Sequence, residues 1–338
     1  YALPMRVTRT RPNIHFHEVT VTNYPLFDHP PYTLALATKM AEVAEMHHLD
    51  LLHCHYAIPH SVSAFLAKSM LLPRKLPVVT TLHGTDITLV GADRSYLPIT
   101  KFSIEQSDGV TAVSNYLREA TLSTFKVEKE IAVVYNFVNC ENFKPAAKRD
   151  LRDFYAPRGE RILIHLSNFR PVKRPADVVE IFARVRAQLP AVLLMVGDGP
   201  ERSNAEWVAR NRSVADQVFF LGKQDNIEEL IASADLLVLP SENESFGLVA
   251  LEAMACEVPV LVSKVGGLSE VVTDGVEGYL VEPRNVERMA ECALAILGDE
   301  TRRREMGKLA RRSARSRFCS TLIIPQYESY YKKVLASC

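Results

Sequence analysis

The 338-residue chain has no net charge, because 40 lysines and arginines balance 40 aspartates and glutamates. Proteins that bind nucleic acid or an anionic membrane surface usually carry a basic excess, so we expect neither as a partner. No apolar run reaches the roughly 20 residues that a membrane-spanning helix needs, and no signal peptide is recognisable. These absences favour a cytoplasmic, globular protein.

The cysteines are scattered and contain no Cys-x-x-Cys pair, which argues against a zinc site or a disulfide framework. We therefore expect reduced, mostly buried thiols. The cysteines are Cys54, Cys140, Cys256, Cys292, Cys319 and Cys338. His53, His55 and His60 lie close together, and His53 and His55 share one face of a predicted strand. This spacing alone does not indicate a set of metal ligands, so we predict no metal site.

Three common catalytic signatures are also missing. The chain has no Gly-x-Ser-x-Gly, no Walker loop and no Gly-x-Gly-x-x-Gly. Their absence argues against a hydrolase triad, an NTPase and an ordinary dinucleotide dehydrogenase.

Short β-branched runs alternate with helical periodicity, which is typical of βαβ units and parallel sheets. The length favours two domains, and a polar, proline-bearing segment at 142–149 separates two such series. We therefore predict an α/β protein of two Rossmann-like, doubly wound domains that face each other across a cleft. The predicted domains are 1–143 and 144–318, followed by a helix at 319–338 that packs back on the N-terminal domain.

The pattern predicts individual elements in both halves. In the first half the expected strands are 14–21, 49–56, 77–83, 109–113 and 131–136, and the expected helices are 33–48, 60–70 and 115–124. In the second half the expected strands are 161–167, 191–197, 217–221, 235–239, 258–262 and 278–281. The expected helices there are 175–188, 200–211, 226–233, 247–256, 268–273 and 286–298. The arginines near the C-terminus are interpreted as a solvated helix face: Arg302, Arg303, Arg304, Arg311 and Arg312.

The most informative segment runs from Glu244 to Ala255. It follows an apolar strand and opens a helix, with a glycine turn between Glu244 and Glu252. Ligands of open α/β sheets bind at this end of a strand. A carboxylate can accept hydrogen bonds from vicinal hydroxyls of a sugar or ribose, and the start of a helix suits a phosphate. The segment therefore offers sites for the parts of a nucleotide sugar.

Two further loops follow predicted strands. The loop 167–174 carries Arg170 and Lys173, which could neutralise a diphosphate leaving group, although a solvated turn can have the same composition. Gly266 and Gly267 precede a helix and let the backbone approach a ligand closely, although a glycine pair is often only a turn.

The first half contains a second candidate region. A strand ends at His83, and Gly84, Thr85 and Asp86 follow it. A histidine in this position can hydrogen-bond a sugar hydroxyl or a phosphate oxygen, and a satisfied core histidine is the alternative. Tyr56, at the end of the preceding strand, is a candidate for lining an acceptor pocket.

Together these motifs resemble the retaining, GT-B-fold glycosyltransferases of family four over nearly the whole chain. Further stretches are similar to the members that transfer N-acetylglucosamine to L-malate: 1–4, 21–27, 55–60, 83–88, 134–137, 167–174 and 220–224. The resemblance implies transfer from UDP-GlcNAc to the hydroxyl of L-malate with retention of the α configuration, the first step of bacillithiol biosynthesis. It implies UDP as the second product and no required cofactor, and it leaves a homo-oligomer open.

The resemblance also implies roles for the candidate residues. His83 would lie beside the sugar and the reacting bond, Arg170 and Lys173 would bind the diphosphate, Glu244 would contact sugar hydroxyls, and Glu252 would hold the ribose. Further donor-binding candidates are Asn168, Gly247, Leu248, Gly266 and Gly267, and the acceptor-binding candidates are Tyr56, Thr85, Arg94 and Lys101. Enzymes similar to this chain are thought to react on the front face of the sugar, where the leaving phosphate oxygen helps to take the acceptor proton.

The chain departs from the family pattern at three places. Lys101 stands where the pattern has arginine, which keeps the charge but loses bidentate geometry. Asn168 replaces a phosphate-binding arginine of many members, and malate-specific members share this asparagine. The strand and glycine-rich loop that open such chains are not found, so we expect a chain that is incomplete before Tyr1 and, if it truly starts there, poorly stable and poorly active.

Three alternatives remain open from the sequence. The first is a retaining transferase with another acceptor, such as a lipid or an inositol phosphate. The second is a UDP-GlcNAc 2-epimerase, which would need no acceptor. The third is a non-catalytic protein that binds a nucleotide sugar.

Overall fold

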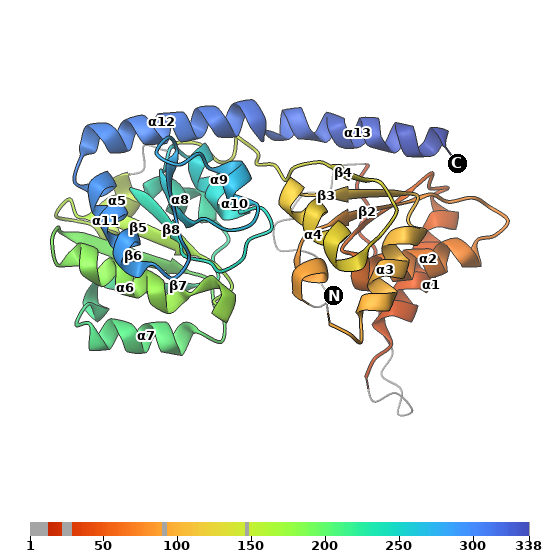
Figure 1. Ribbon diagram of the computed structural model, residues 1–338, viewed down its shortest axis with the longest axis horizontal. Coiled ribbons are helices and arrows are strands. Elements are labelled where there is room, and N and C mark those ends of the chain that lie inside the picture. Colours follow the sequence, from red (N-terminus) through yellow and green to blue (C-terminus); the bar gives the residue numbers. More distant parts are fainter. Residues whose placement is uncertain (1–12, 22–28, 90–92, 146–148, 338) are drawn as a thin grey trace. The chain divides into compact units, whose positions relative to one another are not determined.

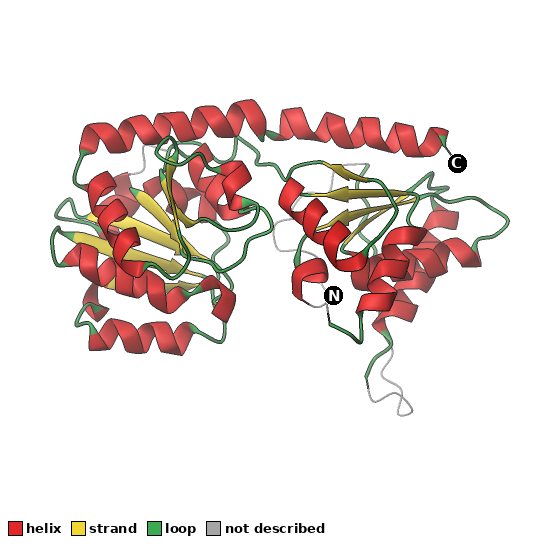
Figure 2. Cartoon of the chain, in the orientation of Figure 1, coloured by secondary structure: helices red, strands yellow, loops and turns green. Residues whose placement is uncertain are grey.

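The computed structural model describes residues 13–21, 29–89, 93–145 and 149–337. The chain divides into two compact units: unit 1 comprises residues 1–135 with 325–338, and unit 2 comprises residues 136–324. In each unit a parallel sheet forms the central layer and helices lie along its faces (Figures 1 and 2).

The unit boundaries differ from the predicted ones at 143/144 and 318/319. Backbone hydrogen bonds explain why residues 136–143 and 319–324 belong to unit 2. The Val138 amide donates to the Phe318 carbonyl at 3.0 Å, and the Ser320 amide donates to the Val138 carbonyl at 3.0 Å. This bridge holds the segment after residue 135 and the start of the last helix in unit 2.

Unit 1 has a four-stranded sheet in the order β1-β2-β3-β4. Its strands are β1 (Leu52–His55), β2 (Val78–Leu82), β3 (Gly109–Ala112) and β4 (Ile131–Val133). Its helices are α1 (Tyr32–Met46), α2 (Val62–Met70), α3 (Leu97–Gln106) and α4 (Asn115–Phe125), with π-helical turns η1 (Ala57–Ser61) and η2 (Thr85–Leu89). The last helix, α13 (Ser320–Ala336), begins in unit 2 and ends in unit 1.

Small apolar side chains set the core of unit 1. Alanines of α1 and α2 pack on Leu52, Cys54 and Val78 of the sheet. Tyr330 of α13 is also fixed to the sheet, because its hydroxyl contacts both the amide and the carbonyl of Val110, at 2.9 and 3.0 Å. These contacts attach the end of α13 to unit 1.

Unit 2 has a six-stranded sheet in the order β10-β9-β8-β5-β6-β7. Its strands are β5 (Arg161–Leu166), β6 (Ala191–Val196), β7 (Val218–Gly222), β8 (Leu236–Leu239), β9 (Val260–Ser263) and β10 (Gly278–Val281). Its longer helices are α5 (Arg149–Tyr155), α6 (Pro175–Arg186), α7 (Arg202–Asn211), α8 (Ile227–Ser233), α9 (Leu248–Ala255), α11 (Val286–Leu297) and α12 (Glu300–Arg317). The short helices are η3 (Pro171–Lys173), η4 (Ala215–Gln217) and α10 (Leu268–Val271).

The central strands of unit 2 are buried on both faces. Alternate side chains such as Leu163, Leu193 and Val238 pack with α6, α7 and α11 in one cluster. Their neighbours Ile162 and Leu194 point to the opposite face, because side chains alternate along a strand, and they are also buried. Burial on both faces explains why these strands appear in the sequence as continuous apolar runs.

The structure confirms most predicted elements within a few residues and corrects others. Residues 14–21 form no strand, and Ile14 and Phe16 are exposed. A strand needs a neighbour to satisfy its backbone groups, and no described strand pairs with this segment. Helix α3 was not predicted, because its buried residues include Thr100 and Ser103 and give no apolar stripe. Helix α5 was not predicted either.

Most of the described cysteines are buried, as the sequence predicts. Cys54, Cys140, Cys256 and Cys292 are buried free thiols, as expected, whereas Cys319 is only half-buried. Cys338 lies outside the described residues.

The solvated-face interpretation of the C-terminal arginines is wrong for Arg303 and Arg311. Their side chains are 15% and 17% exposed and bind groups of unit 2.

Candidate functional site

The sheet order of unit 2 locates a ligand site. If β5 is taken as the first strand, the order is 3-2-1-4-5-6, the Rossmann arrangement. From β5 the chain adds β6 and β7 on one side of the sheet, and it then crosses over to add β8, β9 and β10 on the other side. The switch point therefore lies between β5 and β8, and ligands of such sheets bind outside the carboxyl ends of these two strands. The loops at these ends are 167–174 and 240–247. These loops contain Arg170, Lys173 and Glu244, three of the residues predicted from the sequence.

Lys173 and Glu244 meet at this point. The Lys173 Nζ donates to Glu244 Oε1 at 2.6 Å, and the Ser241 hydroxyl donates to the same oxygen at 2.9 Å. The two charged side chains are only 22% and 14% exposed. A diphosphate next to Lys173 would therefore share its ammonium with Glu244, and the second oxygen of Glu244 could still accept from a sugar hydroxyl.

Glu242 and Arg174 hold the two loops together, and the sequence reasoning missed both residues. The Glu242 amide donates to the Val172 carbonyl at 2.8 Å. Arg174 contacts the Glu242 carboxylate at 3.4 Å and also pairs with Asp177. These contacts position Lys173 beside Glu244.

The predicted glycines are required by close packing between loops. Gly247 has φ +94°, and a Cβ there would lie 2.3 Å from Leu268 Cδ2. The Gly267 amide donates to the Glu244 carbonyl at 2.9 Å, and a Cβ at Gly267 would lie 2.2 Å from the Ser245 carbonyl oxygen. The glycines thus let the Glu244 loop pack directly on the loop after β9, which also contains Gly266.

The other donor candidates take different positions. Arg170, Asn168 and Leu248 are exposed, and Arg170 forms no ion pair with any residue that the structure describes. Glu252 lies on α9 and is half-buried. The structure therefore brings Lys173 and Glu244 into contact and leaves Arg170 on the surface of the same loop.

His165, on β5, contacts the loop that follows this strand. The sequence did not identify it as a site residue. It is fully buried, with Nδ1 2.8 Å from the Val238 carbonyl and Nε2 2.9 Å from the Ser167 hydroxyl. Burial lowers its pKa to about 4, although the bond to Val238 opposes this, and the charge of Lys173 lowers it further. His165 is therefore neutral at physiological pH.

In unit 1 the strand ends bring His83 and Tyr56 together. The His83 Nε2 lies 2.8 Å from His55 Nδ1, and the rings of His83 and Tyr56 have centroids 4.9 Å apart. Burial and the neighbouring charge of His55 lower the pKa of His83 to about 4. His83 is therefore a neutral hydrogen-bonding group near pH 7. The contact with His55 was not foreseen, because the two residues are on different strands.

Asp86 organises the loops around His83. Its carboxylate accepts from the Ala57 amide at 2.7 Å, the Gly84 amide at 2.9 Å and the His83 amide at 3.3 Å. The Asp86 side chain is buried. This residue therefore fixes the backbone after β1 to the backbone after β2, which orients both Tyr56 and His83.

The remaining acceptor candidates are more dispersed. Thr85 and Arg94 are exposed. Lys101 donates to the Lys126 carbonyl at 3.1 Å and lies 3.6 Å from Glu105. Across the described part of unit 1, no hydrogen bond or ion pair joins these three side chains to Tyr56 or His83.

Residues 13–21, 29–89, 93–145 and 149–337 contain neither a metal-binding cluster nor a membrane-spanning helix. Within these ranges, no group of three or more His, Cys, Asp or Glu side chains is arranged to hold a metal ion. No helix of the described segments is long and apolar enough to cross a membrane.

Comparisons with known proteins agree with this architecture. Residues 3–142 match the family model described as Glycosyltransferase Family 4, and residues 148–313 match the model described as Glycosyl transferases group 1. N-acetyl-alpha-D-glucosaminyl L-malate synthase of Bacillus anthracis is 50% identical over 98% of this chain and 87% of its own length. D-inositol 3-phosphate glycosyltransferase of Mycobacterium marinum is 28% identical over 78% of this chain and 59% of its own length.

A solved structure supports the same assignment. Sucrose-phosphate synthase from Thermosynechococcus elongatus superposes with a TM-score of 0.78 and 26% identity, over 97% of this chain and 87% of that one. The chain therefore belongs to the family 4 glycosyltransferases and has their GT-B fold of two Rossmann-like domains. The predicted α/β class with two Rossmann-like domains and the predicted glycosyltransferase family are confirmed.

Proposed function

We propose that this glycosyltransferase moves N-acetylglucosamine from UDP-GlcNAc to the hydroxyl of L-malate, with retention of the α configuration. The observation that carries the proposal is the Lys173–Glu244 pair at the switch point of unit 2. The 50% identity to an L-malate synthase over 98% of the chain supports the choice of donor sugar and acceptor. The reaction would be the first step of bacillithiol biosynthesis in the cytoplasm.

In this proposal unit 2 binds the donor. Lys173 and Arg170 bind the diphosphate, with help from Asn168 and from backbone amides at the start of α9. Glu244 accepts from hydroxyls of the sugar, and Glu252 accepts from the ribose. The Lys173–Glu244 contact supports this assignment, because it places a cation for the diphosphate next to an acceptor for the sugar.

The chemistry follows from charge. The bond between the anomeric carbon and the phosphate oxygen breaks, and a bond from the malate hydroxyl oxygen forms on the same face. The malate proton passes to the departing phosphate oxygen. Negative charge grows on UDP, so fixed positive charge near it lowers the barrier. Lys173 and Arg170 supply that charge, and the proposal requires no metal or other cofactor.

In the same proposal unit 1 binds the acceptor. L-malate has two carboxylates, so its site needs donors such as Tyr56, Thr85, Arg94 and Lys101. His83 is neutral at pH 7, because burial and His55 lower its pKa to about 4. It therefore acts as a hydrogen-bonding group beside the sugar rather than as a cation.

The test is UDP release from UDP-GlcNAc with and without L-malate, combined with mass spectrometry of the product. We expect release that depends on malate and a product with the mass of N-acetylglucosaminyl-malate, whose anomeric proton coupling in NMR indicates the α form. The Glu244→Gln variant should lose turnover. The matched control is Glu282→Gln, which removes an exposed carboxylate of the same unit.

Other outcomes would replace the proposal. Formation of UDP-ManNAc without malate would identify a 2-epimerase. UDP binding without malate-dependent turnover would keep the transferase and reject L-malate as the acceptor. Inositol phosphate would be tested next, because a relative of this chain uses an inositol phosphate by name.

A further inference from the structure

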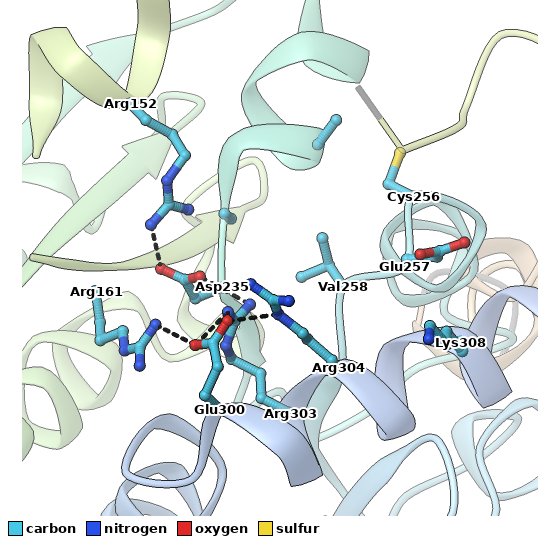
Figure 3. Close-up of a pocket in the computed structure, with 12 residues that line it drawn as sticks. Arg152, Arg161, Asp235, Cys256, Glu257, Val258, Glu300, Arg303, Arg304 and Lys308 are labelled. Carbon is cyan, nitrogen blue, oxygen red and sulfur yellow. Dashed lines mark hydrogen bonds and ion pairs between the residues drawn. The ribbon is translucent and has the colours of Figure 1, made fainter. Parts of the chain in front are cut away.

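A polar pocket lies at the amino-terminal ends of strands in unit 2, away from the Lys173–Glu244 pair (Figure 3). Its volume is about 490 Å³, within the range of small-molecule sites. Arg161 begins β5, Asp235 immediately precedes β8, and Val258 lies just before β9, so the pocket is at the amino-terminal edge of the sheet. The Lys173–Glu244 pair follows the carboxyl ends, roughly 15 Å or more along β5 at about 3.3 Å per residue.

Five cationic side chains line this pocket, and they come from three elements. Arg152 belongs to α5, Arg161 to β5, and Arg303, Arg304 and Lys308 to α12. The four arginines and two carboxylates form one network of ion pairs, shown by the dashed lines in Figure 3.

Both carboxylate oxygens of Asp235 are already engaged. Its side chain is 1% exposed, and Oδ1 lies 2.9 Å from an Arg303 nitrogen. Oδ2 accepts from Arg152 at 3.0 Å and from the Ile162 amide at 2.8 Å. Asp235 therefore cannot neutralise a further cation.

Glu300 is also saturated. It accepts from Arg303 at 2.7 and 2.8 Å, from Arg161 at 2.7 Å and from Arg304 at 2.6 Å. Hydrogen bonding to Arg303, with smaller contributions from Arg161 and Arg304, lowers the pKa of Glu300 to about 2 despite the opposing effect of burial. The arginines therefore create a strongly positive environment around this carboxylate.

The charges that line the pocket do not balance. Four arginines share two carboxylates, which leaves two positive charges. The third acid, Glu257, lies 4.0 Å from Arg311, so Lys308 is also uncompensated among the residues that the structure describes. The C-terminal ends of α8 and α9 contribute about half a negative charge each. A surplus of about two positive charges remains.

Exposed donors carry this surplus. Arg304 is 70% exposed, and among the described residues it hydrogen-bonds Glu300 through Nε alone. Within the same ranges, Arg161 donates to Glu300 through one terminal nitrogen alone. Guanidinium groups bind phosphate and carboxylate oxygens through paired N–H donors. The available donors of Arg161, Arg304 and Lys308 therefore match an oxyanion.

We propose that this pocket binds a small organic dianion, either a phosphate monoester or a dicarboxylate, at a site separate from the donor site. Its two negative charges would compensate the surplus of the arginine network. Lys308 and the free guanidinium nitrogens of Arg304 and Arg161 would donate to its oxygens.

The test is isothermal titration of the full chain with glycerol 3-phosphate and, separately, with succinate, in saturating UDP. We expect one of the two anions to bind with millimolar or tighter affinity. Comparison of the two affinities identifies whether the pocket prefers a phosphate monoester or a dicarboxylate. The Arg304→Gln/Lys308→Gln variant should bind it at least about tenfold more weakly, because it loses two charge-assisted donors.

The matched control is Arg312→Gln/Arg315→Gln, which removes the same charge from α12 outside the pocket. Its affinity should stay within about twofold of the parent, because separated surface charges are screened. Lys308→Gln alone is a milder variant that removes no ion pair described for the pocket, and it should weaken binding in the same direction. Absence of binding by both anions, or equal loss in the control, would overturn the proposal.

Discussion

A double-mutant cycle on Lys173 and Glu244 tests the central feature of the site. The variants are Lys173→Met, Glu244→Gln and the combination. With an N···O distance of 2.6 Å and an effective dielectric of about 20, the Coulomb attraction is roughly 6 kcal/mol. Loss of hydration offsets most of it, because both side chains are largely buried. We expect a net coupling of about 1–3 kcal/mol.

Urea unfolding provides the assay. Trp207 is the single tryptophan of the chain and lies in α7, so its fluorescence reports the unfolding of unit 2. The control cycle uses Lys264 and Glu282, which are 60% and 71% exposed and 3.9 Å apart. Its coupling should be below about 0.5 kcal/mol. Equal couplings in the two cycles would refute the reasoning from burial.

Ligand binding by the same variants tests the assigned roles. Lys173→Met should weaken UDP binding about tenfold or more, because a charge-assisted bond to the diphosphate is lost. Glu244→Gln should strengthen UDP binding by up to roughly tenfold, because Lys173 is no longer shared, while turnover of UDP-GlcNAc falls. If Glu244→Gln weakened UDP binding instead, the shared-ammonium argument would be wrong.

Three further predictions concern stability and reactivity. Gly247→Ala should lower the unfolding free energy by about 2–4 kcal/mol in urea titrations, because its Cβ would overlap Leu268 at positive φ; Gly159→Ala, also at positive φ but with open space, should cost only about 1–2 kcal/mol. The folded-state pKa of His165 is lowered to about 4 from 6.5, so the unfolded chain binds the extra proton between these values. The unfolding free energy should therefore fall as pH drops from 6.5 to 4. In His165→Asn the slope of this fall should be shallower by up to about 1.4 kcal/mol per pH unit. Cys319 should react faster with iodoacetamide at pH 7 than the other described cysteines in peptide mapping. Burial alone would raise the pKa of Cys319, but hydrogen bonds to the neighbouring thiol and to a threonine lower that pKa to about 7. Equal labelling of all described thiols would contradict this prediction.

Local signals in the sequence were sufficient for most of the fold. Strands such as Ala191–Val196 were predictable because a continuous apolar run between turn residues indicates burial on both faces. Helix α6 was predictable from its apolar periodicity. Helix α3 was not, because two of its three buried residues are small and polar and leave no apolar stripe. The segment 14–21 has the composition of a strand but no described partner, and pairing is a property of the whole sheet.

The candidate site divides in the same way. The sequence by itself identified Lys173, Glu244 and Gly247, because residue type and position after a strand predict their chemistry. Only the tertiary structure decided that Lys173 contacts Glu244, since these residues are far apart in the chain and meet through the order of β5 and β8 in the sheet. The His55–His83 contact has the same origin, because it depends on the register of neighbouring strands.

The arginines of α12 show this dependence most clearly. In the sequence Arg303 and Arg304 are adjacent charges on a polar helix, which usually indicates a solvated surface. In the structure Arg303 binds the buried Asp235, and Arg304 remains exposed at the edge of a pocket. Asp235, which binds Arg303 and not Arg304, precedes β8. Its distance from α12 is set by the packing of unit 2 rather than by any local sequence pattern. Residue chemistry was therefore readable from the sequence, and the partners of each charge were fixed by the tertiary structure.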